Sequence, residues 1–253
     1  MRSVSVLGLR VDELDYSRTV EQVRRWAEAG ESRTLCPCTV HTVMEAHDDP
    51  LFRAVMNGTD LVCADGMPVV WTCRWLGLAQ QRVFGPELTE RLCAMAAAHG
   101  IAVGFYGSTP AVIDDLRRRL PARHPGLTIA YAWAPPFRDI SDNEMDTVVQ
   151  AINCSGTRIV FVGLGCRRQE RWMDRARPRL RAVMLGVGWA FDVCSGHSRT
   201  APGWMQQAGL EWLFRLLRHP GKVWKRQLKH NPRFVVLVLR HLLGRWLTGA
   251  ARR

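Results

Sequence analysis

Apolar and polar residues alternate in two distinct patterns along the first 200 positions of the chain. Short runs rich in β-branched residues predict buried strands at residues 33–40, 60–64, 101–108, 127–133, 157–165 and 181–188. Longer amphipathic stretches between them predict helices at residues 18–30, 42–57, 87–99, 109–120, 141–153 and 168–178. Strands that alternate with helices form βαβ units. The pattern therefore predicts an α/β fold with a Rossmann-like, mainly parallel sheet and helices on both faces.

The pattern changes after residue 208, where no further strand is expected. The remaining segment reads as two or three basic amphipathic helices, broken at "HPG" and at "NP". Its longest apolar patch, 234–247, is interrupted by basic residues and is shorter than the roughly 20 residues that cross a bilayer. We therefore divide the chain into a core, 1–208, and a C-terminal appendage, 209–253, that lies on a membrane surface. The alternative is a helix that packs on the core with a solvated basic face.

Charge is distributed very unevenly. The net charge is +12, and residues 212–253 hold eleven Lys and Arg and no Asp or Glu, so almost all of the excess lies in the appendage. Such a segment binds a polyanion, either a phosphate-bearing lipid or a nucleic acid. Nucleic-acid binding is the chief alternative function, but the basic residues are interleaved with Leu and Val and no nucleic-acid module is visible. We therefore expect an anionic membrane surface as partner, and no nucleic acid.

Other features narrow the cellular and chemical setting. Eight cysteines are scattered without a CxxC pair, which is typical of buried thiols in a reducing compartment. The N-terminus becomes acidic before any apolar core of signal-peptide length, so we expect the protein in the cytoplasm. The chain contains no GxSxG elbow, Walker motif, HExxH or DxD triplet. We therefore expect neither a catalytic metal nor another cofactor.

Asp65 is the first candidate for chemistry. It follows the buried run at 60–64 in "CADGMPVVW", and Gly66 and Pro68 constrain the backbone after it. A carboxylate that is partly buried at this place has a raised pKa and accepts a proton better near neutrality. The alternative is an Asp that caps the next helix.

Glycines follow three other predicted strands, in "FYGSTP" (Gly107), "VGLGCRRQE" (Gly163 and Gly165) and "GVGWAFD" (Gly188). Glycine lets the backbone approach a ligand, and the N-terminus of a following helix favours a phosphate. Ordinary strand-to-helix turns explain each of them equally well. A nucleotide-dependent dehydrogenase is disfavoured, because "GVGWAF" lacks the last glycine of the dinucleotide motif.

Polar residues stand beside two of the strand ends. Gln169 and Glu170 open a helix after a glycine turn and would face the strand ends, although a Glu in a first helical turn also serves as a cap. Thr39 and His41 end the first strand, where a lone histidine has either a structural or a functional role. We treat all four as candidate substrate-binding residues.

Seven segments occur in a fixed order between about residues 35 and 235. They are "VHTVMEAHDDPLFRAVMNGTDLVCADGMPVVW", "RVFGPEL", "FYGS", "PPFR", "VGLGCRRQERWM", "GVGWAFDVCSGHSRTAPGWMQQAGLEWLFRLLRHP" and "KRQLKHNPRF". Together they resemble the WecG/TagA/CpsF family, glycosyltransferase family 26. The resemblance implies transfer of a sugar, of N-acetylmannosamine type or a hexose, from a UDP-sugar to a polyprenyl-diphosphate-linked acceptor by an inverting, metal-independent reaction. "VHTVMEA", "DGMPVVW" and "PPFR" are more similar to the exopolysaccharide branch than to the teichoic-acid branch.

The resemblance also implies roles for particular residues. The aspartate of the family's "DG" falls on Asp65, which would be the general base that takes the proton of the acceptor hydroxyl. The family's "GxGxPxQExW" falls on Gly163–Trp172, and its arginine-rich appendage, which docks on the membrane and closes the site, falls on the residues from Gly209 onward. Further expected substrate contacts are Gly66, Arg82, Asp192, Arg215 and Arg226.

The chain differs from the family's motifs at three places. The proline before "QE" is Arg167 here, which changes the turn or adds a phosphate-binding cation. The family's "RAP" reads "TAP" at Thr200–Pro202, with Arg199 one place earlier. Either Cys38 or Thr39 stands in place of the family's Asn near the end of the first strand.

We expect an enzyme that is peripheral on the inner face of the cytoplasmic membrane, and a homo-oligomer is left open.

Overall fold

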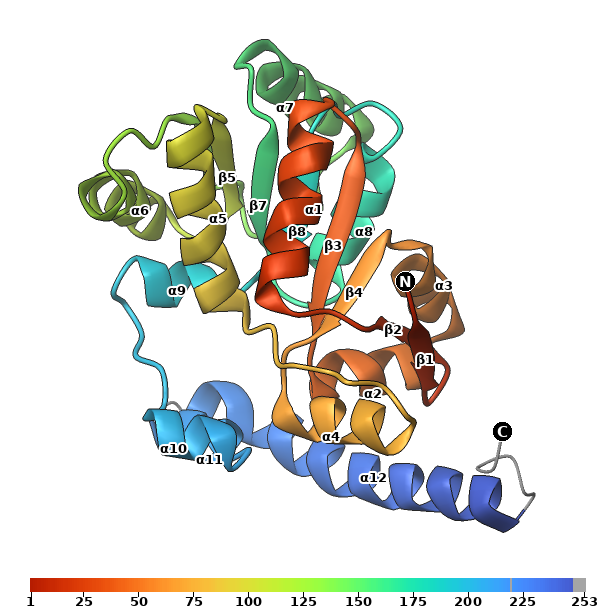
Figure 1. The fold of residues 1–253 in the computed structure, drawn as a ribbon. Coiled ribbons are helices and arrows are strands. Elements are labelled where there is room, and N and C mark those ends of the chain that lie inside the picture. The colour runs from red at the N-terminus through yellow and green to blue at the C-terminus, as the bar shows by residue number, and fades with distance from the viewer. Residues whose placement is uncertain (219, 248–253) are drawn as a thin grey trace.

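A six-stranded sheet forms the centre of the molecule (Figure 1), whose computed structural model describes residues 1–218 and 220–247. The strands are β3 (Arg33–Cys38), β4 (Leu61–Ala64), β5 (Val103–Gly107), β6 (Ile129–Trp133), β7 (Ile159–Gly163) and β8 (Val183–Gly186). They lie in the order β4-β3-β8-β7-β5-β6, and all neighbouring pairs are parallel. All six strands expected from the sequence are present, which confirms the α/β fold.

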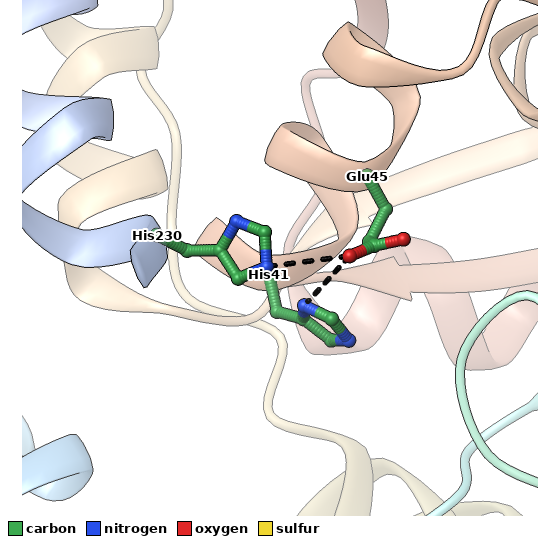
Figure 2. Close-up of side chains that lie close together, drawn as sticks. All are labelled: His41, Glu45 and His230. Carbon is green, nitrogen blue, oxygen red and sulfur yellow. Dashed lines mark ion pairs between the residues drawn. The ribbon is translucent and has the colours of Figure 1, made fainter. Parts of the chain in front are cut away.

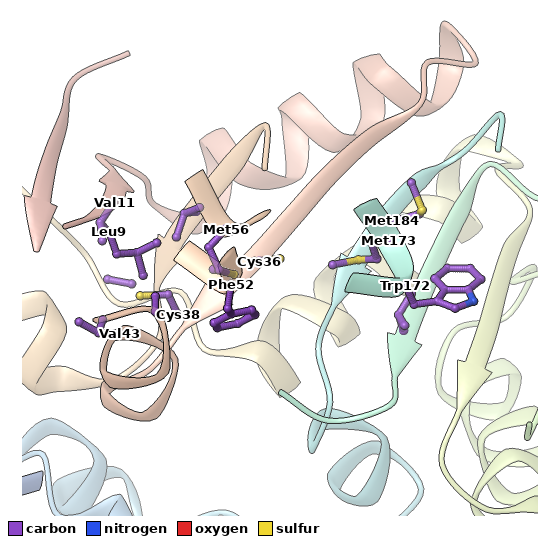
Figure 3. Packing of buried hydrophobic residues seen from close by; sticks show 14 of the residues in the cluster. Leu9, Val11, Cys36, Cys38, Val43, Phe52, Met56, Trp172, Met173 and Met184 are labelled. Carbon is purple, nitrogen blue, oxygen red and sulfur yellow. The ribbon is translucent and has the colours of Figure 1, made fainter. Parts of the chain in front are cut away.

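Helices cover both faces of the sheet. They are α1 (Tyr16–Glu28), α2 (Val40–Asp48), α3 (Pro50–Gly58), α4 (Met67–Trp75), α5 (Gly85–His99), α6 (Pro110–Arg123), α7 (Asp142–Cys154), α8 (Arg168–Ala176), α9 (Ala190–Cys194), α10 (Gly203–Gln207), α11 (Glu211–Arg218) and α12 (Pro220–Leu247). Buried side chains of α2, α3, α4, α7, α8 and α12 form one apolar cluster, part of which Figure 3 shows. Those of α1, α5, α6 and α9 form a second cluster on the opposite face.

Successive residues of each strand divide between the two clusters. In β7, Val160 and Val162 belong to the first cluster, whereas Ile159 and Phe161 belong to the second. All four are fully buried. The strands therefore read as continuous apolar runs, as in any parallel sheet that is covered on both faces.

The N-terminal hairpin was not expected from the sequence. Strands β1 (Ser3–Val6) and β2 (Leu9–Asp12) pair antiparallel outside the main sheet. The two residues that join them, Leu7 and Gly8, both have positive φ, 51° and 93°. Leucine rarely adopts this conformation, and the usual Asn-Gly or Asp-Gly signal of such a turn is missing.

Helices α4, α9 and α10 were also not predicted.

The helix expected at 42–57 is two helices, α2 and α3. Asp49 ends the first, and its carboxylate accepts hydrogen bonds from the backbone N–H groups of Leu51 (3.0 Å) and Phe52 (3.1 Å). Pro50 stands at the first position of α3, where its missing N–H costs nothing. An Asp-Pro pair thus stops one helix and begins the next.

The C-terminal helices agree only in part with the sequence prediction. Helix α11 ends at Arg218 and α12 begins at Pro220, so the break at "HPG" is confirmed. The break expected at "NP" is wrong, because α12 continues through Pro232 to Leu247. Phe234 and Val238 are buried in the cluster that includes α2, and this packing outweighs the loss of one backbone hydrogen bond at the proline.

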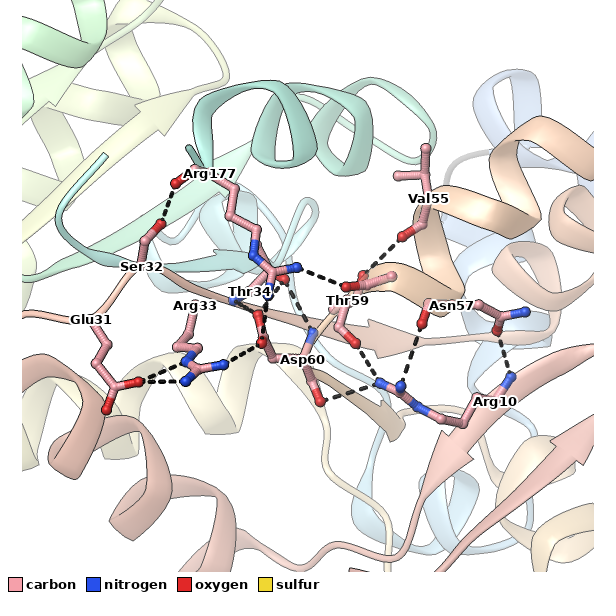
Figure 4. Close-up of polar contacts among 11 residues, drawn as sticks. Arg10, Glu31, Ser32, Arg33, Thr34, Val55, Asn57, Thr59, Asp60 and Arg177 are labelled. Carbon is pink, nitrogen blue, oxygen red and sulfur yellow. Dashed lines mark hydrogen bonds and ion pairs between the residues drawn. The ribbon is translucent and has the colours of Figure 1, made fainter. Parts of the chain in front are cut away.

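A polar network fixes the amino ends of β3 and β4 (Figure 4). The Asp60 carboxylate accepts hydrogen bonds from Arg33 (3.0 Å), from Arg177 (2.8 Å) and from the backbone N–H of Thr34 (2.9 Å). The Thr34 hydroxyl donates a further bond at 3.1 Å. This carboxylate joins β4, β3 and the segment after α8, and its charge is fully compensated.

Candidate active site

A cavity of about 670 Å³ opens at the carboxyl ends of the central strands. On the sheet side it is lined by Pro37, Thr39, Asp65, Gly163, Gly186 and Val187, which lie at the ends of β3, β4, β7 and β8. On the other side it is lined by Gln206, Glu211, Trp212, Arg215, Asn231 and Phe234 from α10, α11 and α12. Ligands of open parallel sheets bind at this edge, where the strand order reverses. The C-terminal helices therefore complete the wall of a site that the sheet begins.

Asp65 lies directly after β4 and faces this cavity. The capping alternative is wrong for the next helix, because Gly66 is the N-cap residue of α4 and no side chain caps this helix. One carboxylate oxygen instead accepts a hydrogen bond from the backbone N–H of Gly85 (3.3 Å), the first residue of α5. Burial, which penalises the ionised form, raises the pKa of Asp65 to about 6, against the lowering effect of Arg82. A carboxylate with this pKa is mostly ionised at pH 7 and is a stronger base than an exposed aspartate.

Arg82 connects Asp65 to the C-terminal helices. Its Nη2 lies 3.5 Å from Asp65 Oδ1 and also makes a short ion pair with Glu211 at the start of α11. Its Nη1 donates to Gln206 Oε1 (3.0 Å) in α10. The guanidinium stacks over the Phe84 ring at 4.2 Å. Arg82 is thus held between a carboxylate of the sheet and a carboxylate of α11.

Gln169 and Glu170 lie where the sequence placed them, in the first turn of α8, and both are buried. Glu170 accepts a bond from the backbone N–H of Arg167 (2.6 Å), so the capping interpretation is confirmed, and burial raises its pKa to about 7. Gln169 donates through Nε2 to Glu170 (2.9 Å) and to the Gly186 carbonyl (2.8 Å). The other amide atom of Gln169, Oε1, is buried and has no protein partner in the described part of the chain. A buried acceptor in the wall of a cavity is suited to accept a hydrogen bond from an N–H or O–H group of a ligand.

The predicted glycines divide into two groups. Gly66, Gly163, Gly165 and Gly188 line the cavity, and Gly188 has a φ of 47° beside Gln169. Gly107 is not among the lining residues of the described chain; its neighbour Ser108 is. A Cβ at Gly107 would come within 2.5 Å of the Gly163 backbone, so this glycine allows β5 and β7 to end side by side.

Thr39 and His41 occupy the end of β3 and the first turn of α2, and both line the cavity. The Thr39 hydroxyl accepts from the backbone N–H of Thr42 (3.4 Å) and so caps α2. Cys38 is fully buried and is not a lining residue, which leaves Thr39 as the one of the two that faces the cavity. His41 lies next to Glu45 and to His230 of α12.

The expected cations have different surroundings. Arg215 lines the cavity and lies over the Trp189 ring at 4.1 Å. Arg167 does not serve as a free phosphate-binding cation, because its guanidinium pairs with Glu45 (3.0 Å) and Asp49. The side chain of Arg226 lies outside the described residues, and its role stays a prediction. Arg199 is exposed and does not line the cavity, whereas Asp192 does.

Sequence reasoning missed several lining residues. Glu211 and Gln206 hold Arg82, and Trp189 stacks with Arg215. Glu211 is the last acidic residue of the chain, and this position at the start of the basic segment was the available signal. The helices of the described residues include none that is both long and apolar enough to cross a membrane.

Sequence comparison adds two findings. Residues 4–247 match the protein family described as the glycosyl transferase WecG/TagA/CpsF family. The chain is also 33% identical over 199 residues to the N-acetylglucosaminyldiphosphoundecaprenol N-acetyl-beta-D-mannosaminyltransferase of Bacillus spizizenii. That alignment covers 78% of this chain and 75% of the relative.

Proposed function

Since the chain belongs to the WecG/TagA/CpsF family of glycosyltransferases, we propose that it moves a sugar from a UDP-sugar to a polyprenyl-diphosphate-linked acceptor. The sugar is an N-acetylmannosamine-type sugar or a hexose, and the product enters a cell-surface polysaccharide, an exopolysaccharide in the branch that the sequence resembles most. The relative's name, which specifies a mannosaminyl group and a diphosphoundecaprenol acceptor, supports this class of substrates. The observation that carries the proposal is Asp65, a buried carboxylate with a raised pKa in the cavity wall.

The proposed reaction is one displacement with inversion and without a metal. The acceptor hydroxyl oxygen attacks the anomeric carbon, its proton passes to the Asp65 carboxylate, and the bond from that carbon to the UDP β-phosphate oxygen breaks. UDP leaves on the opposite face with the electron pair of the broken bond. Arg82 and Arg215, which both line the cavity, are placed to stabilise the negative charge that develops on the diphosphate.

An exposed apolar stripe of α12 supports the proposed location at a membrane. Leu228, Val235, Leu239 and Leu243 recur at helical spacing, and each has between 50% and 59% of its surface exposed. Leu228 and Val235 also line the cavity, so the stripe runs from the cavity along the helix. Basic residues of the same helix, Lys229, Arg233 and Arg240, are exposed beside this stripe. Apolar side chains flanked by basic ones are typical of helices that lie on anionic lipid. We propose that α12 holds the enzyme on the inner face of the cytoplasmic membrane, next to its lipid-linked acceptor.

A vesicle-flotation experiment tests this location. We expect full-length protein to float with anionic vesicles and the Leu239→Glu/Leu243→Glu variant to lose most of this binding, because two charges enter the apolar stripe. Leu51→Glu is the control, since Leu51 is even more exposed (78%) but belongs to α3. Equal flotation of all three proteins would contradict docking through α12.

The activity is tested with purified protein, a panel of UDP-sugars and a short-chain polyprenyl-diphosphate-linked N-acetylglucosamine. We expect UDP release that depends on the acceptor for one class of donor, together with a glycolipid heavier by one sugar in mass spectrometry. NMR of the product gives the anomeric configuration and therefore tests inversion. UDP release that is the same with and without acceptor, for every donor, would contradict the proposed transferase activity.

A further inference from the structure

Three side chains with metal-binding atoms meet beside the cavity, where α12 packs on α2 (Figure 2). They are His41 and Glu45 of α2 and His230 of α12. We propose that they bind a divalent transition-metal ion, with Zn²⁺ as the best fit, and that this ion fixes α12 to the core. The proposed ion has a structural role and takes no part in sugar transfer.

The spacing of the three atoms fits one ion. His41 Nδ1 lies 3.8 Å from Glu45 Oε1, and His230 Nε2 lies 3.3 Å from the same oxygen. All three ligand atoms lie within 4.8 Å of one another. A tetrahedral Zn²⁺ with bonds of about 2.0–2.1 Å holds its ligand atoms about 3.4 Å apart. Imidazole nitrogen and carboxylate oxygen are ordinary zinc ligands, and two histidines with one glutamate leave the fourth position for water.

The fold holds these ligands in place before any ion binds. His41 and Glu45 are one helical turn apart on the same face of α2. Arg167 pairs with the second oxygen of Glu45 at 3.0 Å and thereby orients the carboxylate, in the manner of the groups that surround metal ligands. Phe234 and Val238, both buried, seat α12 on the cluster that includes α2. Metal binding therefore requires little ordering of side chains.

The three proposed ligands are shielded from solvent. The side chains of His230, Glu45 and His41 are 3%, 15% and 23% exposed. One oxygen of Glu45 contacts both imidazole rings, so an ion at this place would meet all three ligands in a largely enclosed site. Arg167 and Lys229 lie close enough to weaken the attraction for a cation. We therefore expect affinity in the micromolar range, weaker than that of a four-ligand structural zinc site.

The proposed ion would also help to place α12 at the cavity. His41 lines that cavity, which gives the ion a path of entry. Asn231 and Phe234, which follow His230 in α12, line it as well. An ion that bridges α2 and His230 would hold these two side chains at the cavity wall.

Isothermal titration of chelator-treated, full-length protein with ZnCl₂ tests the proposal. We expect one equivalent to bind with micromolar affinity, a rise of several degrees in the unfolding temperature, and no response to MgCl₂. His230→Ala should bind Zn²⁺ at least tenfold more weakly, whereas His99→Ala, which removes an exposed histidine of α5, should bind like the wild type. Co²⁺ should give the visible absorption of a four-coordinate site, and this absorption should vanish in His230→Ala.

Two outcomes would overturn the proposal. Wild-type protein that binds no Zn²⁺ would show that the three side chains form ion pairs only. Equal affinity of wild type and His230→Ala would place the ion elsewhere, for example on a cysteine. If His230→Ala does not fold, Glu45→Gln preserves the shape of the side chain and removes its charge, and the same two readouts apply to it.

Discussion

Strand β4 has a carboxylate immediately before it and another immediately after it, and the two ends differ in how each charge is compensated. Asp60, at the amino end, is surrounded by Arg33, Arg177 and two donors of Thr34, all within 3.1 Å. Asp65, at the carboxyl end, has one backbone donor at 3.3 Å and an arginine at 3.5 Å that is shared with Glu211. Their side chains are 10% and 14% exposed, so burial does not distinguish them.

We interpret the difference as a division of roles, in which the amino end of the sheet stabilises the fold and the carboxyl end holds the proposed base. A carboxylate whose hydrogen bonds are all made by the protein contributes to stability and has no capacity left for a substrate. A buried carboxylate with few partners is costly, and its raised pKa makes it a useful base. The amino edge of the sheet is therefore structural, and the carboxyl edge is the place where chemistry is expected.

Asp65→Asn should give the largest effect. The change keeps the shape of the side chain and removes the base, so we expect the turnover number to fall by about 10²- to 10⁴-fold. Stability at pH 8 should be unchanged or higher, because an ionised carboxylate with a raised pKa costs folding free energy above that pKa. Steady-state kinetics and thermal unfolding measure the two quantities. Wild-type turnover in the variant would remove Asp65 from the mechanism, and Asp114→Asn, an exposed change on α6, is the control.

Asp60→Asn should give the opposite result. Two arginines lose a charged partner, and we expect the free energy of unfolding to fall by about 2–3 kcal/mol. This is less than for a fully buried pair, because Arg33 and Arg177 are about one third exposed. The folded fraction should keep its activity per molecule. Urea unfolding gives the stability, and active-site titration normalises the rate. A large loss of turnover with unchanged stability would contradict a purely structural role for the amino edge of the sheet.

Much of the sheet follows from the sequence, because a strand that is buried on both faces is a continuous apolar run, as at 159–163. The position of Asp65, Gln169 and Thr39 at the cavity could be predicted, because short turns place residues after a strand at one edge of the sheet. Glu211 was missed, since its contact with Arg82 joins positions 129 residues apart. The course of α12 through Pro232 was also missed, because burial of Phe234 and Val238 decides it and local preference does not.

The pH dependence of the wild-type enzyme should reveal the unusual carboxylate directly. Asp65 must be ionised to accept a proton, and burial raises its pKa to about 6. We therefore expect kcat/KM to fall on the acid side with an apparent pKa near 6, and to drop about tenfold for each pH unit below it. An ordinary aspartate would keep the rate constant down to about pH 4. A profile that stays flat to pH 4.5 would contradict the buried base.

Glu211→Gln should give the smallest effect and the sharpest test of how the C-terminal helices act on the sheet. The negative charge of Glu211 raises the pKa of Asp65, and Glu211 also holds Nη2 of Arg82, whose positive charge lowers that pKa. Glutamine keeps the length of the side chain and removes the charge. The pKa of Asp65 should then fall, because the raising effect of Glu211 is lost and the lowering effect of Arg82 remains. The acid limb of kcat/KM should move to lower pH, because the base becomes easier to ionise.

The same change should slow the reaction at pH 8, where Asp65 is ionised in both proteins, because a weaker base accepts the proton less readily; we expect a decrease smaller than about tenfold. Glu211→Asp, which keeps the charge, should restore the acid limb toward its wild-type position. A rate decrease without movement of the acid limb would mean that Glu211 only helps to seat α11. Movement of the limb in Glu211→Gln, reversed in Glu211→Asp, would show that this helix sets the basicity of a carboxylate on β4.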